Sequence, residues 1–117
     1  MGDVSFSAED RDRDLCRVLV EAHEHIERYL LGLKVQDFLM QEMVQDAVTM
    51  RLQQVLECAN KLSPEIRSQL PIHWPSLAAM RNKISHTYDE VDRRVIWTVV
   101  RELEEFRRLI EFARGKV

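Results

Sequence analysis

Glycine and proline are scarce in this chain, since each occurs only three times among 117 residues. These two residues form most tight turns, so we expect few turns and long elements between them. The chain also lacks alternating apolar and polar residues and has no hairpin dipeptide, which argues against a β-sheet. No stretch approaches the roughly 18 apolar residues of a membrane-spanning helix. The sequence therefore predicts a helical protein that does not cross a membrane.

Cysteine is also rare, with only Cys16 and Cys58 present. Each lies in an amphipathic stretch without a cysteine neighbour at metal-ligand spacing, and this pattern favours buried, reduced thiols. The first residues lack the basic patch and apolar run of a secretory signal. We therefore expect a cytoplasmic protein.

Charge is distributed unevenly along the chain. The net charge of −3 argues against a general nucleic-acid binder. Residues 1–80 carry 8 Lys and Arg against 13 Asp and Glu, whereas residues 81–117 carry 9 against 7. A polyanion such as RNA would therefore prefer the C-terminal third of the chain.

Apolar residues recur at three- and four-residue steps in three long stretches, which is the pattern of amphipathic helices. Residues 1–8 show no such periodicity, so we expect a loose tail followed by one domain over residues 9–117. The predicted long helices cover residues 9–31, 36–62 and 93–114.

Two shorter helices are predicted between the second and third long ones. Ser63 and Pro64 form a start signal, an N-cap followed by a first-turn proline, and this helix should end near Leu70. Trp74, followed directly by proline, opens another helix that should fade near His86. The predicted fold is an all-α, up-and-down antiparallel bundle of four to five helices.

Two polar features inside the predicted helices are further candidate sites. His23 and His25 are two residues apart, so their rings diverge by about 200° and cannot share a metal ion on one helix face. We expect no metal there and two solvated histidines. Glu57 stands in the apolar second helix and is a candidate buried partner for Arg51 or Arg81.

The main functional candidate is the set formed by Arg81, Asn82, His86 and Tyr88, which precedes the last helix. A guanidinium holds phosphate oxygens in a fixed fork, and an imidazole moves protons near neutral pH. RNA carries its own nucleophile, the 2′-OH, so such a set can cut RNA without a metal. The alternative is that the arginine and histidine only cap a helix and pair with nearby acids. The acids available are Asp89, Glu90 and Asp92.

This pattern, arginine-asparagine, three residues, histidine, one residue and tyrosine, resembles the HEPN superfamily motif. More narrowly, the chain resembles the HepT-like proteins, the toxin half of HepT–MntA modules, from Arg13 to about Ala113. Other matching stretches, beside the motif itself, include Ile26-Glu27-Arg28-Tyr29, Gln45-Asp46-Ala47-Val48, Leu62-Ser63-Pro64-Glu65-Ile66-Arg67, Val91-Asp92 and Ile96-Trp97.

The resemblance implies a metal-independent endoribonuclease that needs no cofactor and is the toxin of a type VII toxin–antitoxin module. By this resemblance, the catalytic residues of the chain would be Arg81 and His86, and Asn82 would position the RNA. The expected partners are a second copy of the chain and an MntA-like nucleotidyltransferase antitoxin that attaches AMP to Tyr88. The substrate would be RNA, because DNA lacks the 2′-OH nucleophile.

Two other functions remain open from the sequence. The chain could be a non-catalytic HEPN-like module that binds a nucleotidyltransferase or nucleotides, or a plain helical dimer whose motif residues cap helices. A homodimer is expected because one chain supplies a sparse site that a two-fold axis would double. The last helix also groups four apolar residues that could contact a partner. They are Val95, Ile96, Val99 and Val100.

Overall fold

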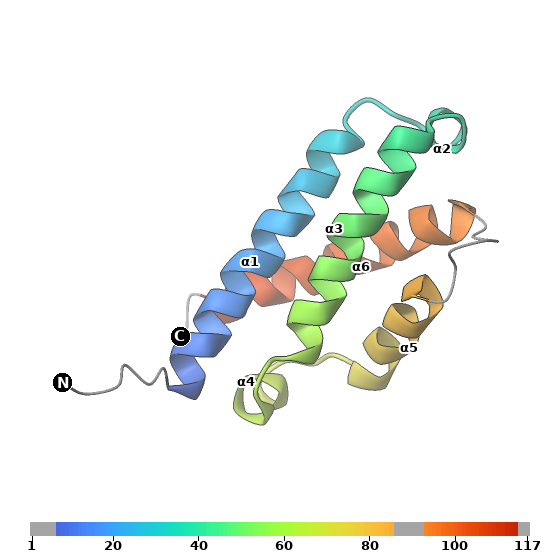
Figure 1. The fold of residues 1–117 in the computed structure, drawn as a ribbon. Coiled ribbons are helices and arrows are strands. Elements are labelled where there is room, and N and C mark those ends of the chain that lie inside the picture. The colour runs from blue at the N-terminus through green and yellow to red at the C-terminus, as the bar shows by residue number, and fades with distance from the viewer. Residues whose placement is uncertain (1–6, 86–92, 115–117) are drawn as a thin grey trace.

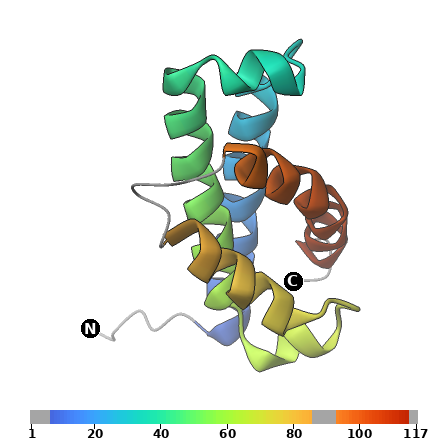
Figure 2. The same cartoon turned by 90° about the vertical axis from the view of Figure 1, so that its right-hand side faces the viewer.

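The computed structural model describes residues 7–85 and 93–114, and every regular element in these ranges is a helix. The long helices α1 and α3 lie side by side and antiparallel, α6 packs against both, and α4 and α5 lie at one end (Figures 1 and 2). The predicted all-α bundle is confirmed. The helices are α1 (Ala8–Tyr29), α2 (Val35–Leu39), α3 (Glu42–Asn60), α4 (Pro64–Ser68), α5 (Trp74–Ser85) and α6 (Arg93–Arg114).

Side chains cap the starts of α1 and α4, and the start signal predicted at Ser63 and Pro64 is confirmed. Ser7 and Asp10 form a reciprocal capping box at the start of α1, which satisfies two backbone N–H groups that no helical carbonyl can reach. The Ser63 hydroxyl accepts a hydrogen bond from the Ile66 backbone N–H, with Pro64 in the first turn of α4. Gly32 turns the chain after α1 with a φ of 79°, a conformation that suits glycine.

The single long helix predicted over residues 36–62 is wrong, because the chain breaks between α2 and α3. Gln41 is extended, with φ −122° and ψ 90°, and precedes the first turn of α3. The Gln45 side-chain amide donates a hydrogen bond of 2.8 Å to the Phe38 carbonyl, which satisfies a backbone acceptor at the end of α2. The break turns Phe38 into the core, where its ring lies 5.5 Å from that of Trp97.

The core lies between α1, α3 and α6, and α4 and α5 close its lower end in Figure 1. Cys16 and Cys58 are buried free thiols, as expected. Among the described residues, none of the helices has the length and apolar character needed to cross a membrane. The largest fully buried hydrophobic side chains are Phe38, Leu19, Ile26, Leu52, Leu56, Ile66, Ile96, Leu103 and Ile110.

Candidate active site at the end of helix α5

Helix α5 carries the first half of the predicted motif. It packs against α3, which fixes the direction in which its polar residues point. Arg81 is half-buried and Asn82 is exposed, both within the last turns of the helix. His86 and Tyr88 lie outside the described residues, as do the acids that could pair with the motif. The structure therefore places the arginine and the asparagine, and the roles of the histidine and tyrosine remain predictions.

The Arg81 side chain forms no hydrogen bond or ion pair with any residue in the described ranges. The buried ion pair considered for Glu57 is wrong, because Glu57 is exposed. The other candidate partner, Arg51, instead donates hydrogen bonds to the Tyr29 hydroxyl and to Gln54. Within the described residues the Arg81 guanidinium therefore has donors free for a ligand, as a phosphate-binding arginine must.

Arg81 lines a hollow of about 260 Å³ between the end of α3, helix α4 and helix α5. Its volume lies just below the usual range for small-molecule sites, so it suits a group the size of one nucleobase or phosphate. The other lining residues are Leu56, Ala59, Asn60, Arg67, Trp74, Pro75, Leu77 and Ala78.

Arg67 supplies a second positive charge to this hollow. Its guanidinium donates to the Leu62 carbonyl at 3.0 Å and to the Asn60 carbonyl at 2.5 Å, so it caps the C-terminal end of α3. It also lies over the Trp74 ring, 5.1 Å from the ring centroid. No described carboxylate forms an ion pair with Arg67, so its charge is not neutralised within this part of the chain.

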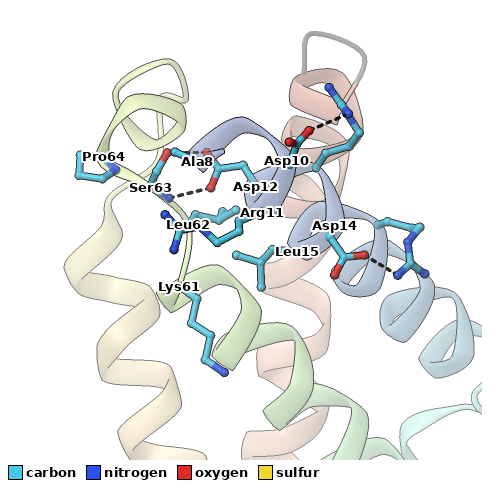
Figure 3. A pocket seen from close by; sticks show the side chains of 12 residues that line it. Ala8, Asp10, Arg11, Asp12, Asp14, Leu15, Lys61, Leu62, Ser63 and Pro64 are labelled. Atoms are coloured by element: carbon cyan, nitrogen blue, oxygen red, sulfur yellow. Dashed lines mark hydrogen bonds and ion pairs between the residues drawn. The ribbon is translucent and has the colours of Figure 1, made fainter. Parts of the chain in front are cut away.

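A larger hollow, of about 1060 Å³, lies elsewhere, between the start of α1 and the turn from α3 to α4 (Figure 3). Buried Asp12 accepts hydrogen bonds from the backbone N–H of Ser63, at 2.9 Å, and from its hydroxyl. Arg17 pairs with Asp14 on the same helix face. These acids are engaged within the chain, and Asp12 ties α1 to the start of α4, so we interpret this hollow as a structural joint.

The expectation that His23 is solvated is wrong, because it is 1% exposed between α1 and α6. Its Nδ1 lies 3.2 Å from a Glu27 carboxylate oxygen, so a neutral ring donates there. Burial lowers the pKa of His23, and the positive charge of Arg107 lowers it further. His25 is half-buried on the same helix. Within the described ranges, His, Cys, Asp and Glu side chains form no cluster of three or more that could hold a metal ion.

Arg107 of α6 is the main charged group facing α1. It forms ion pairs with Glu27, with Glu24 at 3.6 Å, and with Glu111 at 3.2 Å. Its side chain is 18% exposed, so solvent and salt weaken these ion pairs less than they would weaken pairs at the surface. This network fastens α6 to α1 and has no contact with the hollow beside Arg81.

The apolar group near the start of α6 does not form the free surface that the sequence suggested. Ile96, Val99 and Val100 are buried in the core of the single chain, and Val95 is partly buried against it. These side chains are therefore already covered by α6 packing against its own bundle, and they provide no argument for a second copy.

Comparison with known proteins identifies the family. The family model described as Ribonuclease HepT-like matches residues 19–113. The chain is 33% identical over 91 residues, 77% of this chain and 83% of the relative, to "Probable ribonuclease HepT" of Thermococcus cleftensis. It is 29% identical over 96 residues, 80% of this chain and 85% of the relative, to "Putative RNase TTE0752" of Caldanaerobacter subterraneus subsp. tengcongensis. No solved structure matches significantly. With its all-α bundle, the chain therefore belongs to the HepT-like HEPN ribonucleases.

Proposed function

We propose that this protein is the toxin of a type VII toxin–antitoxin module and cuts RNA internally without a metal ion. The observation that carries the proposal is the Arg81 guanidinium, which has no partner in the described residues and lines a hollow in a HepT-like ribonuclease. An unpaired, half-buried arginine at the end of a rigid helix is suited to binding a phosphate in a fixed orientation.

The proposed chemistry uses the RNA's own 2′-OH as nucleophile. His86 removes the 2′-OH proton as the oxygen attacks phosphorus, a new P–O2′ bond forms, and the P–O5′ bond breaks. The leaving 5′ oxygen takes a proton from an acid, for which the histidine of a second copy is available. Arg81 holds the phosphate and stabilises the charge that builds on its oxygens, while exposed Asn82 positions the RNA. The products are a 2′,3′-cyclic phosphate and a 5′-hydroxyl end.

A homodimer follows from this chemistry rather than from the α6 surface. One chain supplies a single motif arginine and a single motif histidine, which is too few for a separate base, acid and phosphate clamp. A two-fold axis would place two copies of each residue in one cleft. Light scattering under assay conditions should give twice the monomer mass, and a monomer that retains activity would contradict the dimer.

Tyr88 is proposed as the point of control by a nucleotidyltransferase antitoxin. An AMP group on Tyr88, two residues from His86, would add a negative charge and bulk where RNA phosphate must bind. The Tyr88→Phe protein should keep its RNase activity and resist neutralisation by the antitoxin and ATP. Intact-mass analysis should find the AMP adduct on Tyr88, and an adduct on Tyr29 instead would overturn this assignment.

The decisive experiment is RNA cleavage by the purified protein in the presence of a chelator. The wild-type protein should cut single-stranded RNA and leave single-stranded DNA intact. His86→Ala should lower the rate by roughly 10²–10⁴-fold. Full activity of His86→Ala, or an absolute requirement for Mg²⁺, would contradict the mechanism. Binding of RNA or nucleotides by the wild-type protein without cleavage would favour a non-catalytic module.

A further inference from the structure

We propose that Arg67 and Trp74 form a stacking platform for one base of single-stranded RNA, next to the phosphate held by Arg81. This inference rests on the proposed ribonuclease function and adds a substrate-binding subsite to it. The subsite would lie at the junction of α3, α4 and α5, the lower end of the molecule in Figure 1.

The first support is the position of the three side chains. Trp74, Ala78 and Arg81 follow at steps of four and three residues on α5, so they share one face of the helix. At about 1.5 Å per residue, the first and last are separated by roughly 10 Å along the axis. All three line the same hollow. One nucleotide can bridge such a distance, with its phosphate at Arg81 and its base near Trp74.

The second support is the rigidity of Arg67. Hydrogen bonds to the Leu62 and Asn60 carbonyls hold its guanidinium in one orientation over the Trp74 ring. The Trp74 indole N–H in turn donates to the Arg67 carbonyl at 3.3 Å, and its ring meets Phe106 edge to face. A guanidinium plane fixed on an aromatic ring offers its outer side to a nucleobase, with little ordering needed on binding.

The third support is the space and charge around the pair. Arg67 and Trp74 line both the hollow of about 260 Å³ beside Arg81 and an adjoining open hollow of about 580 Å³. The described lining of the two hollows contains Arg67 and Arg81 but no carboxylate. In a chain with a net charge of −3, this surface is suited to a polyanion with exposed bases, which single-stranded RNA provides.

The chain offers a matched control pair. On α6, Arg101 lies over the Trp97 ring at 5.6 Å, but neither residue lines these hollows. Substitutions of this second pair therefore make the same chemical change away from the proposed path of the RNA.

The test is a cleavage assay with short single-stranded oligoribonucleotides, in which one base at a time is replaced by an abasic site. In the wild-type protein, loss of the base on the platform should raise KM at least about fivefold, the effect expected for one stacked base. Arg67→Lys and Trp74→Phe should raise KM for the intact oligonucleotide and make the enzyme insensitive to that abasic site. Arg101→Lys and Trp97→Phe should keep the wild-type profile. A purely structural role would lower activity by the same factor for every oligonucleotide.

A binding measurement separates this inference from the ribonuclease proposal. In Trp97→Phe protein that also carries His86→Ala, Trp74 is the sole tryptophan, and its fluorescence should be quenched as the intact oligonucleotide binds. Quenching without cleavage by the wild-type protein would support the platform and refute the ribonuclease mechanism. Cleavage with no quenching, or with an unchanged abasic profile in Arg67→Lys, would refute the platform alone.

Discussion

Arginine side chains have different surroundings in two regions of the molecule: the face between α1 and α6, and the end formed by α4 and α5. Arg107 on the first face is surrounded by the carboxylates of α1 and of its own helix. Arg67 and Arg81 at the other end form no ion pair with any described carboxylate. The difference separates charge used to hold helices together from charge left for a ligand. In a chain with more acidic than basic residues, two arginines that line one hollow and pair with no described carboxylate mark the candidate RNA-binding surface.

The largest effect is expected from Arg81→Ala, which removes a charge without removing a hydrogen bond or ion pair within the described residues. The rate of RNA cleavage should fall by roughly 10²–10³-fold, because the charge on the phosphate oxygens loses its donor. Arg81→Lys should recover little of this, since an ammonium does not reproduce the guanidinium fork. Urea unfolding should show both proteins to be nearly as stable as the wild type. A large loss of stability in Arg81→Ala would show that its side chain serves the fold instead.

Arg107→Ala should show the reverse behaviour. Removing a partly buried arginine leaves three glutamates close together, and we expect a loss of about 1–3 kcal/mol in the free energy of unfolding. The range is below that of a fully buried pair, because the glutamates are about half-exposed. Cleavage per folded molecule should stay near the wild-type value. A loss of activity as large as that of Arg81→Ala, with unchanged stability, would remove the distinction between the two faces.

Asp12→Ala tests the joint between α1 and α4. The Ser63 backbone N–H and hydroxyl would lose their buried acceptor, which should cost about 1–2 kcal/mol in the free energy of unfolding. The Ser63 hydroxyl would still accept from the Ile66 N–H at the start of α4, but Asp12 would no longer hold it in place. Asp14→Ala on the same helix is the control, since Asp14 is exposed and pairs only at the surface. Equal stability of the two variants by urea unfolding would show that the joint is not important.

Helix positions could be predicted from the sequence wherever local chemistry determines them. The capping signal at Ser63 and the apolar stripe of α6 are confirmed. The break between α2 and α3 could not be predicted, since neither glycine nor proline occurs at Met40 or Gln41. It depends on a hydrogen bond from Gln45 across the turn and on burial of a ring from α2, which are contacts between elements.

The buried polar residues of α1 follow a periodic pattern that is visible in the sequence. Asp12, Cys16, Leu19, His23 and Ile26 recur at helical steps and form one buried stripe. Because the aspartate and the histidine share this stripe with apolar residues, the helical period indicates that both face the core.

For the candidate site, the sequence predicts roles for Arg81 and Asn82, which stay predictions, whereas the position of Arg67 beside Trp74 depends on how α4 lies next to α5. That contact between elements has no local signature, so only the structure could bring the second arginine to the same hollow.

The smallest effect is expected from the titration of His23, and it concerns stability rather than activity. Burial holds the pKa of His23 in the folded protein below its ordinary value of 6.5. Above that pH neither the folded nor the unfolded state binds this proton. As the pH falls below 6.5, the unfolded state is protonated first, so the free energy of unfolding decreases until the pH reaches the folded-state pKa.

The groups around His23 determine how strong this effect is. Glu27 accepts from its ring on α1, and Arg107, Glu104 and Glu111 face it from α6, with the arginine opposing protonation and the acids favouring it. Urea unfolding of the wild-type protein at pH 7.0 and at about pH 5.5 should show a loss that is smaller in His23→Gln, which has no proton to bind at this position. His25→Gln should remove a smaller part of the dependence, because burial and the charges of Arg51 and Arg28 also lower the pKa of His25 but its ring is more exposed than that of His23. The same pH dependence in His23→Gln as in the wild type would assign the titration to other groups. In that case the ion pairs between α1 and α6 would stabilise the fold without any contribution from the titration of His23.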